Sequence, residues 1–319
     1  MKSLQQTCSE ARPQNRRIGL ALSGGGARGS AHIGVLKALQ RYRVTIDEIA
    51  GTSAGAVVAA MYAARPDPAW IARRFAEYLE SDVFKSLGTQ RLAKRFEKGS
   101  LESVFSRRFK DHMVVNMSLM REFVIPRSRL EAAFRFLIPA ETFSELALPL
   151  VVCAADVRHG TPVIYHSGDL INALCNSASI PGVLEADVVG EQVIVDGGVF
   201  FPVPVEPLRP RNQLVIASDV NQRRLPELQQ ISVYSLSTRA ENLAQMSLAR
   251  LQAEQADVTI FSDVFGLHWS QFGAYEELIK SGEAAAEDAM DLVLDRIKAM
   301  RSPLGRLKHR LRSWLDRAR

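Results

Sequence analysis

Residues 46–64 read IDEIAGTSAGAVVAAMYAA, and this order predicts a buried strand, a tight turn and an apolar helix. The strand is expected over Ile46–Gly51 and the helix over Ala54–Ala64. A short apolar run that ends at a glycine is typical of a strand buried on both faces. The helix has eleven residues. A bilayer needs about 20 apolar residues, so we expect this helix to lie inside the protein.

A similar strand-turn-helix unit comes directly before this stretch. The apolar run Ile18–Ser23 leads into Gly24-Gly25-Gly26-Ala27-Arg28-Gly29, and a helix is expected over Ser30–Arg41. Two such units in succession predict a parallel sheet with helices on its faces. Both turns should then lie at the carboxyl ends of adjacent strands, where open α/β sheets place their functional sites.

The rest of the chain predicts one continuous α/β domain with a helical insert at 68–145. Further strands are expected at 149–155, 162–166, 192–195, 213–220 and 258–261, and helices at 169–177, 238–255 and 275–300. We expect a flexible N-terminus at 1–16, the core at 17–220, completing elements at 221–300 and a basic tail at 301–319.

Composition excludes several classes of protein. The chain has 319 residues, of which 47% are hydrophobic and 24% charged, and this usage excludes disordered, collagenous and coiled-coil proteins. The net charge is +5, but residues 301–319 hold seven basic residues and one acidic residue, which leaves −1 on residues 1–300. A neutral body without a basic, aromatic patch argues against nucleic acid as a partner.

The cysteines and the N-terminus indicate a cytoplasmic protein. Cys8, Cys153 and Cys175 show no CxxC spacing, which argues against a zinc ribbon or a disulfide framework. Residues 1–17 lack an apolar central region, so we expect no secretory signal and no lipidation at Cys8.

The glycine loop fits three kinds of site in principle. A dinucleotide site needs an acidic residue at the end of the second strand, but Asp47 and Glu48 lie at its beginning. A Walker A loop needs Lys after its last glycine, and here Ser30 follows. An oxyanion hole, in which backbone N–H groups approach a substrate oxygen, fits better. A plain strand-to-helix turn is the alternative.

The pentapeptide Gly51-Thr52-Ser53-Ala54-Gly55 is a GxSxG sequence between a strand and a helix. This context predicts a nucleophile elbow with Ser53 as the nucleophile, and a helix-capping serine is the alternative. Two residues are candidates for the base. Asp196 ends an apolar strand before two glycines, whereas His268 follows a strand without such a frame. Because Asp-Gly-Gly is also an ordinary turn sequence, these residues alone leave the base open.

Taken together, the motifs resemble the patatin-like phospholipase family, in particular its bacterial members and the catalytic domain of neuropathy target esterase. The resemblance covers residues 17–220. It rests on the glycine loop, the GxSxG elbow, Ser177-Ala178-Ser179-Ile180-Pro181 and Asp196-Gly197-Gly198, in the family's order. It implies a three-layer α/β fold, with a mostly parallel central sheet and helices on both faces. Ser23 is a departure, because many members have Asp there.

The resemblance also implies a Ser-Asp dyad, with Ser53 as nucleophile and Asp196 as general base. The oxyanion hole would come from Gly24, Gly25, Gly26, Arg28 and Gly29, with the N–H groups of Gly25 and Gly26 as donors. Arg28 would orient the loop or neutralise it, or bind a phosphate. Gly51, Gly55, Gly197 and Gly198 would shape the elbow and the loop of the base. The implied reaction uses no cofactor and no metal.

The implied substrates are lipid esters, either phospholipids or lysophospholipids. A regulatory or partner-binding protein on the same fold is the alternative function. The basic tail places five apolar residues on one helical face, namely Leu304, Leu307, Leu311, Trp314 and Leu315. This pattern predicts contact with an anionic membrane through 301–319, and a docked or solvated helix is the alternative. Residues 68–145 are expected to cap the site. The sequence indicates no oligomeric state.

Overall fold

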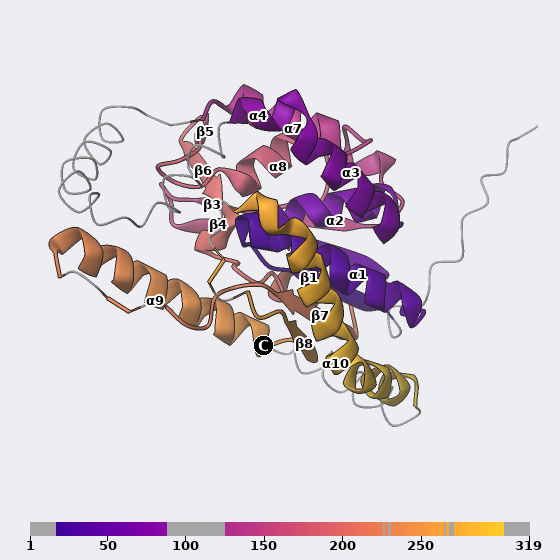
Figure 1. Ribbon diagram of the computed structural model, residues 1–319. Coiled ribbons are helices and arrows are strands. Elements are labelled where there is room, and N and C mark those ends of the chain that lie inside the picture. Colours follow the sequence, from indigo (N-terminus) through magenta and orange to yellow (C-terminus); the bar gives the residue numbers. More distant parts are fainter. Residues whose placement is uncertain are drawn as a thin grey trace, which may run out of the picture.

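The computed structural model describes residues 17–302, except for 88–124, 226, 229, 230, 265 and 268–270. Within this part, a single mixed sheet runs in the order β5-β6-β3-β2-β1-β7-β8, with β4 paired to β3 (Figure 1). Its strands are β1 (Ile18–Leu22), β2 (Glu48–Thr52), β3 (Leu150–Asp156), β4 (Thr161–Tyr165), β5 (Asp187–Val189), β6 (Gln192–Asp196), β7 (Leu214–Asp219) and β8 (Val258–Phe261).

The centre of the sheet is parallel and one end is antiparallel. Strands β3, β2, β1, β7 and β8 are parallel neighbours in that order. Strands β4 and β6 both run antiparallel to β3, and β5 runs antiparallel to β6. The predicted, mostly parallel sheet is confirmed, and its antiparallel end carries the Asp-Gly-Gly turn.

Helices follow most strands of the sheet. They are α1 (Ala31–Arg41), α2 (Ala54–Ala64), α3 (Pro68–Glu80), α4 (Asp82–Leu87), α7 (Arg127–Leu137), α8 (Leu170–Ala178), α9 (Val233–Ala253) and α10 (Tyr275–Arg301). Short 3₁₀ turns lie at Gly26–Ser30, Phe143–Glu145, Gly197–Val199, Glu206–Leu208 and Phe272–Ala274. The two strand-turn-helix units predicted from the sequence are therefore present.

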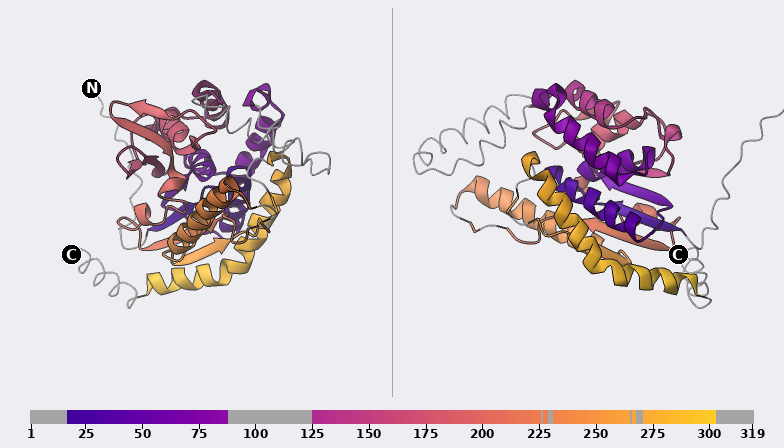
Figure 2. Two further views of the ribbon diagram at one scale, coloured as in Figure 1. Left: turned by 90° about the vertical axis from the view of Figure 1, so that its left-hand side faces the viewer. Right: turned by 45° about the vertical axis from the view of Figure 1, so that its right-hand side comes forward.

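Alternate strand residues face two different cores, because successive side chains of a strand point to opposite faces. Leu20 and the strand residues that point to the same face of the sheet belong to the larger core, which the helices α1, α2, α8 and α10 cover. Ala21 and the strand residues that point to the opposite face of the sheet form a smaller core with residues 201–208 and the end of α9. The result is three layers, with helices on both faces of the sheet (Figure 2).

Helices α1 and α10 pack closely through two glycines. A Cβ atom at Gly34 would lie 1.9 Å from the carbonyl oxygen of Ile279, and one at Gly282 would lie 1.9 Å from that of Ala31. Arg41 adds ion pairs to Glu283 and Glu287.

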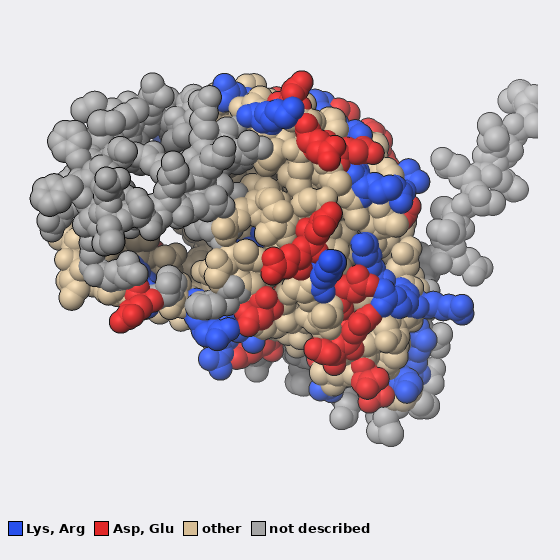
Figure 3. Space-filling model, viewed as in Figure 1, with Lys and Arg blue, Asp and Glu red and all other residues tan. Residues whose placement is uncertain are grey.

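Figure 3 shows basic and acidic side chains interspersed over the face of the molecule seen in Figure 1, in keeping with the near-neutral body predicted from the sequence.

Some expectations lie outside the described residues, namely those for the N-terminus at 1–16, for 88–124 of the helical insert and for 303–319 of the tail. The division of the chain into domains stays a prediction. The short strand β5 was not predicted from the sequence. None of the helices in the described part combines the length and the apolar character that a membrane crossing requires.

Candidate active site

Ser53 occupies a strained turn between β2 and α2. Its φ of 54° and ψ of −126° are unusual for a residue with a side chain, and such strain is found most often at functional sites. The flanking glycines have no space for a Cβ atom. One at Gly55 would lie 2.4 Å from the carbonyl oxygens of Leu22 and Ser23, and one at Gly51 would lie 2.4 Å from Cα of Ala56. The turn therefore has the form of a nucleophile elbow.

Sheet pairing explains why Asp196 lies near Ser53. Val152 and Cys153 of β3 pair with β2 on one side and with β4 on the other. Strand β2 ends at Thr52, opposite Cys153, and the next residue of β3, Ala154, pairs with Asp196 of β6. Ala154 also pairs with β4, which occupies one side of β3. Strand β6 must therefore lie on the other side of β3, next to the point where β2 ends. The end of β6 therefore meets the end of β2.

The Asp196 carboxylate is largely buried from solvent. The residue is 8% exposed, and Ser53 is 7% exposed. Burial raises the pKa of Asp196 to about 6, although hydrogen bonds from the Ser53 side chain and the Gly198 N–H act to lower it. The Gly198 bond is 2.7 Å long. A carboxylate with this pKa accepts protons more readily than an ordinary one, which suits a general base near neutral pH.

The glycine loop lies beside the elbow. A Cβ atom at Gly24 would be 3.6 Å from Cβ of Ser53, and one at Gly29 would be 2.8 Å from Cβ of Ala54. The Gly24 N–H donates to the carbonyl oxygen of Pro202 at 3.1 Å, so it is not available to a substrate. Within the described residues, no protein acceptor meets the N–H groups of Gly25 and Gly26. These two remain the candidate oxyanion donors.

Arg28 stabilises the glycine loop through two hydrogen bonds within it. Its backbone N–H and its side-chain Nε both donate to the carbonyl oxygen of Gly25, at 3.3 and 3.1 Å. Burial lowers the pKa of Arg28 to about 10, and the charge of Asp219 opposes this change. The guanidinium is therefore still a cation at neutral pH, next to the proposed oxyanion donors.

His32 supports the same loop, a role that the sequence did not indicate. Its Nε2 lies 2.9 Å from the carbonyl oxygen of Ser23, and its Nδ1 lies 2.7 Å from Oγ of Ser218. Burial lowers the pKa of His32 to about 4, so the ring is neutral at pH 7. A carbonyl only accepts, so Nε2 carries the proton and Nδ1 accepts from Ser218. Ser23 itself accepts from the Val220 N–H, which gives the unusual serine a structural role.

The end of α8 holds both candidate catalytic residues. The Ser177 hydroxyl accepts from the Ser53 N–H at 2.9 Å and donates to the carbonyl of Cys153 at 2.6 Å. Two residues later, the carbonyl of Ser179 accepts from the Asp196 N–H at 2.9 Å. The Ser-Ala-Ser-Ile-Pro sequence therefore links the elbow to the loop of the base.

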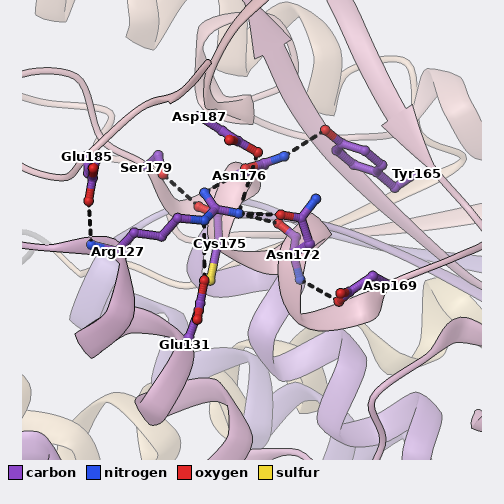
Figure 4. Close-up of polar contacts among 10 residues, drawn as sticks. All are labelled: Arg127, Glu131, Tyr165, Asp169, Asn172, Cys175, Asn176, Ser179, Glu185 and Asp187. Atoms are coloured by element: carbon purple, nitrogen blue, oxygen red, sulfur yellow. Dashed lines mark hydrogen bonds and ion pairs between the residues drawn. The ribbon is translucent and has the colours of Figure 1, made fainter. Parts of the chain in front are cut away.

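Arg127 ties α8 to its surroundings, as Figure 4 shows. Its guanidinium donates to the side-chain oxygens of Asn176 at 2.8 Å and Asn172 at 2.6 Å. It also pairs with Asp187 of β5 at 3.6 Å. Asn176 directly precedes Ser177, so this arginine acts on the helix end that holds Ser53. Nothing local in the sequence around Arg127 indicates this role, because all these contacts are long-range.

Other residues considered in the sequence lie elsewhere. Asp47 accepts from the Ile18 N–H, and Glu48 pairs with Arg211, at the opposite edge of the sheet from Ser53. This agrees with the argument against a dinucleotide site. His268 lies outside the described residues.

These features define an α/β protein with a candidate serine-hydrolase site at the carboxyl edge of its sheet. A family model described as patatin-like phospholipase matches residues 20–209, and the chain belongs to this family.

Similar proteins share only part of their length with this chain. An uncharacterised NTE family protein of Mycobacterium tuberculosis is 32% identical over 207 residues, which cover 64% of this chain and 49% of that protein. A lysophospholipase, NTE1, of Cryptococcus neoformans is 24% identical over 203 residues, 61% of this chain and 10% of that protein. The chain thus spans about half the length of the first of these relatives.

Two solved structures are also similar. The human GIVD cytosolic phospholipase A2 has a TM-score of 0.46 at 15% identity, covering 97% of this chain and 61% of that one. VipD from Legionella pneumophila has a TM-score of 0.46 at 16% identity, covering 86% of this chain and 67% of that one.

Proposed function

We propose that the chain is a lipid acyl hydrolase in which Ser53 is the nucleophile and Asp196 the general base. One observation carries this proposal. A serine held at a φ of 54° on an elbow has its side chain beside a buried aspartate, and burial raises the pKa of that aspartate to about 6. A nucleophilic hydroxyl needs such a base within reach, and the base works best when its pKa is near the working pH.

The reaction proceeds in two steps. Asp196 takes the Ser53 proton as Oγ attacks the ester carbonyl, and the C–O bond to the alcohol breaks as that alcohol receives the proton. Water, deprotonated by Asp196, then attacks the acyl-serine; the bond from the acyl carbon to Ser53 Oγ breaks, Oγ receives the proton back from Asp196, and the fatty acid leaves. The N–H groups of Gly25 and Gly26 stabilise the oxyanion in both steps, and losing one such donor costs roughly 100-fold or more in rate.

Phospholipids and lysophospholipids are the proposed substrates. Arg28 supports this choice, because it is a cation at neutral pH beside the glycine loop and can pair with a phosphate near the scissile ester. Family membership supports the same substrate class.

The test is hydrolysis of a soluble short-chain ester and of a phospholipid by the wild type, Ser53→Ala, Asp196→Asn and His268→Asn. We expect no activity above background for Ser53→Ala and a loss of about 10²- to 10⁴-fold for Asp196→Asn. His268→Asn is expected to keep wild-type activity. Activity that survives Ser53→Ala overturns the nucleophile, and a folded but inactive His268→Asn replaces the dyad with a triad. A wild type without esterase activity favours the regulatory alternative.

A further inference from the structure

Residues 197–203 form a connecting segment between the three parts of the candidate active site. The segment begins directly after the proposed base. Its Phe201 carbonyl accepts from the Thr52 hydroxyl of the elbow at 2.7 Å. Its Pro202 carbonyl accepts from the Gly24 N–H of the glycine loop at 3.1 Å. A displacement of this segment would therefore move the base relative to the elbow and the oxyanion donors.

Two glutamines of α9 bond the connecting segment. Gln245 donates from Nε2 to the carbonyl oxygen of Gly198 at 2.6 Å. Gln252 donates from Nε2 to the Phe200 carbonyl at 2.7 Å, and its Oε1 accepts from the Val203 N–H at 3.1 Å. Seven residues are about two turns of a helix, so both glutamines lie on the same face of α9. The helix therefore contacts the segment near both of its ends.

The end of α9 that carries these glutamines is firmly packed. Ala249 and Ala253 are buried in the smaller core, and Gln252 is 8% exposed. A hydrogen bond in such a buried environment is stronger than one in water. The family model matches residues 20–209, so α9 lies beyond the matched part. A packed helix outside the family core thus bonds the segment that joins the active-site parts.

Gln245 lies next to a group that stabilises the ionised base. The Gly198 N–H donates to Oδ1 of Asp196 at 2.7 Å, and the Gly198 carbonyl accepts from Gln245. A Cβ atom at Gly198 would lie 3.0 Å from that Oδ1 and 3.5 Å from Nε2 of Gln245. Burial raises the pKa of Asp196 to about 6, and the two groups that oppose this rise, the Ser53 side chain and the Gly198 N–H, are uncharged. The position of Gly198 therefore affects how readily Asp196 takes a proton.

We propose that Gln245 and Gln252 are positioning residues that hold the connecting segment in the conformation that catalysis requires. Gln245 holds the end next to Asp196, and Gln252 holds the end that contacts the elbow and the glycine loop. The consequence for the rate rests on the proposed function, whereas the effect on Asp196 also appears in the stability of the protein. Because the two glutamines act at different ends, their loss has different consequences.

The test compares the wild-type chain with Gln245→Met, Gln252→Met and Gln40→Met. Profiles of kcat and KM on a soluble ester are measured from pH 4.5 to 8, together with Tm. Methionine keeps the helix propensity nearly unchanged but removes the amide donor. Gln40 is the control, because it has the same side chain in an exposed position on α1. Gln252→Glu, which keeps an acceptor for the Val203 N–H, replaces Gln252→Met if that variant does not fold.

We expect Gln245→Met to raise the pH midpoint of kcat/KM by about half a unit or more, because a displaced Gly198 N–H stabilises the carboxylate less. The loss of kcat/KM is then about threefold at pH 5 and small at pH 8. Gln252→Met should lower kcat about threefold or more at every pH, with little change in KM and an unchanged midpoint, because the elbow and the glycine loop shift. Gln40→Met should match the wild type.

Several results overturn the proposal. An unchanged midpoint in Gln245→Met, or an equal shift in Gln40→Met, removes the positioning role of Gln245. A lower Tm with wild-type kcat in Gln252→Met shows that this residue stabilises the fold without positioning the site.

A second measurement separates this proposal from the proposed function. If the wild type hydrolyses no ester, the proposed function fails, and urea unfolding at pH 8 still tests Gln245. Asp196→Asn should then stabilise the Gln245→Met background more than it stabilises the wild type, because the buried charge has lost part of its hydrogen bonding. An equal gain in both backgrounds overturns the role of Gln245.

Discussion

The hydroxyl of Ser177 accepts a hydrogen bond from the backbone N–H of Ser53 at 2.9 Å and so fixes the strained elbow to the end of α8. The same hydroxyl donates to the carbonyl of Cys153. Cys153 lies where the pairing partner of β3 changes from β2 to β6. One buried hydroxyl thus connects three segments that meet at the candidate active site. The elbow's geometry depends on α8 as well as on its own glycines.

Ser177→Ala should therefore impair activity and stability together. It leaves the Ser53 N–H and the Cys153 carbonyl buried without their partner, which costs about 1–3 kcal/mol of unfolding free energy. We expect kcat on a soluble ester to fall at least about tenfold, because a small displacement of a nucleophile is costly. Ser179→Ala is the matched control, since within the described part of the chain its hydroxyl bonds only the Cys175 carbonyl of α8. Equal losses of kcat in both variants would contradict this role.

The raised pKa of Asp196 predicts the pH dependence of the reaction. Only the ionised carboxylate can accept the Ser53 proton, and its pKa is about 6 in the folded protein. Hydrolysis of a soluble ester should therefore fall about tenfold per pH unit below pH 6 and level off above it. A profile of kcat/KM from pH 4.5 to 8 measures this midpoint. A midpoint near 4, the value of an ordinary aspartate, would show that the carboxylate is not desolvated.

The same carboxylate should cost the protein stability at neutral pH. The pKa of Asp196 is higher in the folded state than its ordinary value of 3.8, so folding disfavours the ionised form. The penalty is absent below about pH 4, grows between pH 4 and 6, and is fully present above pH 6. Asp196→Asn removes it and should stabilise the protein by roughly 2–3 kcal/mol at pH 8.

Urea unfolding of Asp196→Asn and the wild type at pH 4 and pH 8 measures this difference. The gain must appear at pH 8 and shrink at pH 4. A gain that is equal at both pH values would point to a packing effect of the amide and not to the buried charge.

The sequence was informative where function depends on local turns. The GxSxG turn needs its two glycines because neighbouring backbone leaves no space for a Cβ atom at Gly51 or Gly55, and the glycine loop needs Gly26 for its φ of 59°. The motifs therefore identified Ser53 as the candidate nucleophile, and pairing of β6 with β3 then explains why Asp196 lies beside it.

Contacts between distant segments could not be predicted in this way. His32 reaches Ser218 across 186 residues, and Arg127 reaches Asn176 across 49. A single histidine or arginine has no periodicity or spacing that marks its partner. The exposure of apolar side chains on α9, such as Val233 and Leu251, was also not predicted, because only the packed structure shows which face of that helix is exposed.

Arg127 offers a last prediction, as a positioning residue that acts through α8. Its guanidinium bonds both Asn172 and Asn176, and a planar fork can do this where a single ammonium cannot. Arg127→Lys should lower kcat on a soluble ester several-fold with little change in KM, and Arg127→Met should lower it further. Arg129→Lys on the same helix is the control, because the guanidinium of Arg129 bonds, among the described residues, only the Ser86 carbonyl at the surface. If Arg127→Met lowers Tm but leaves kcat unchanged, Arg127 stabilises the fold without positioning Ser53.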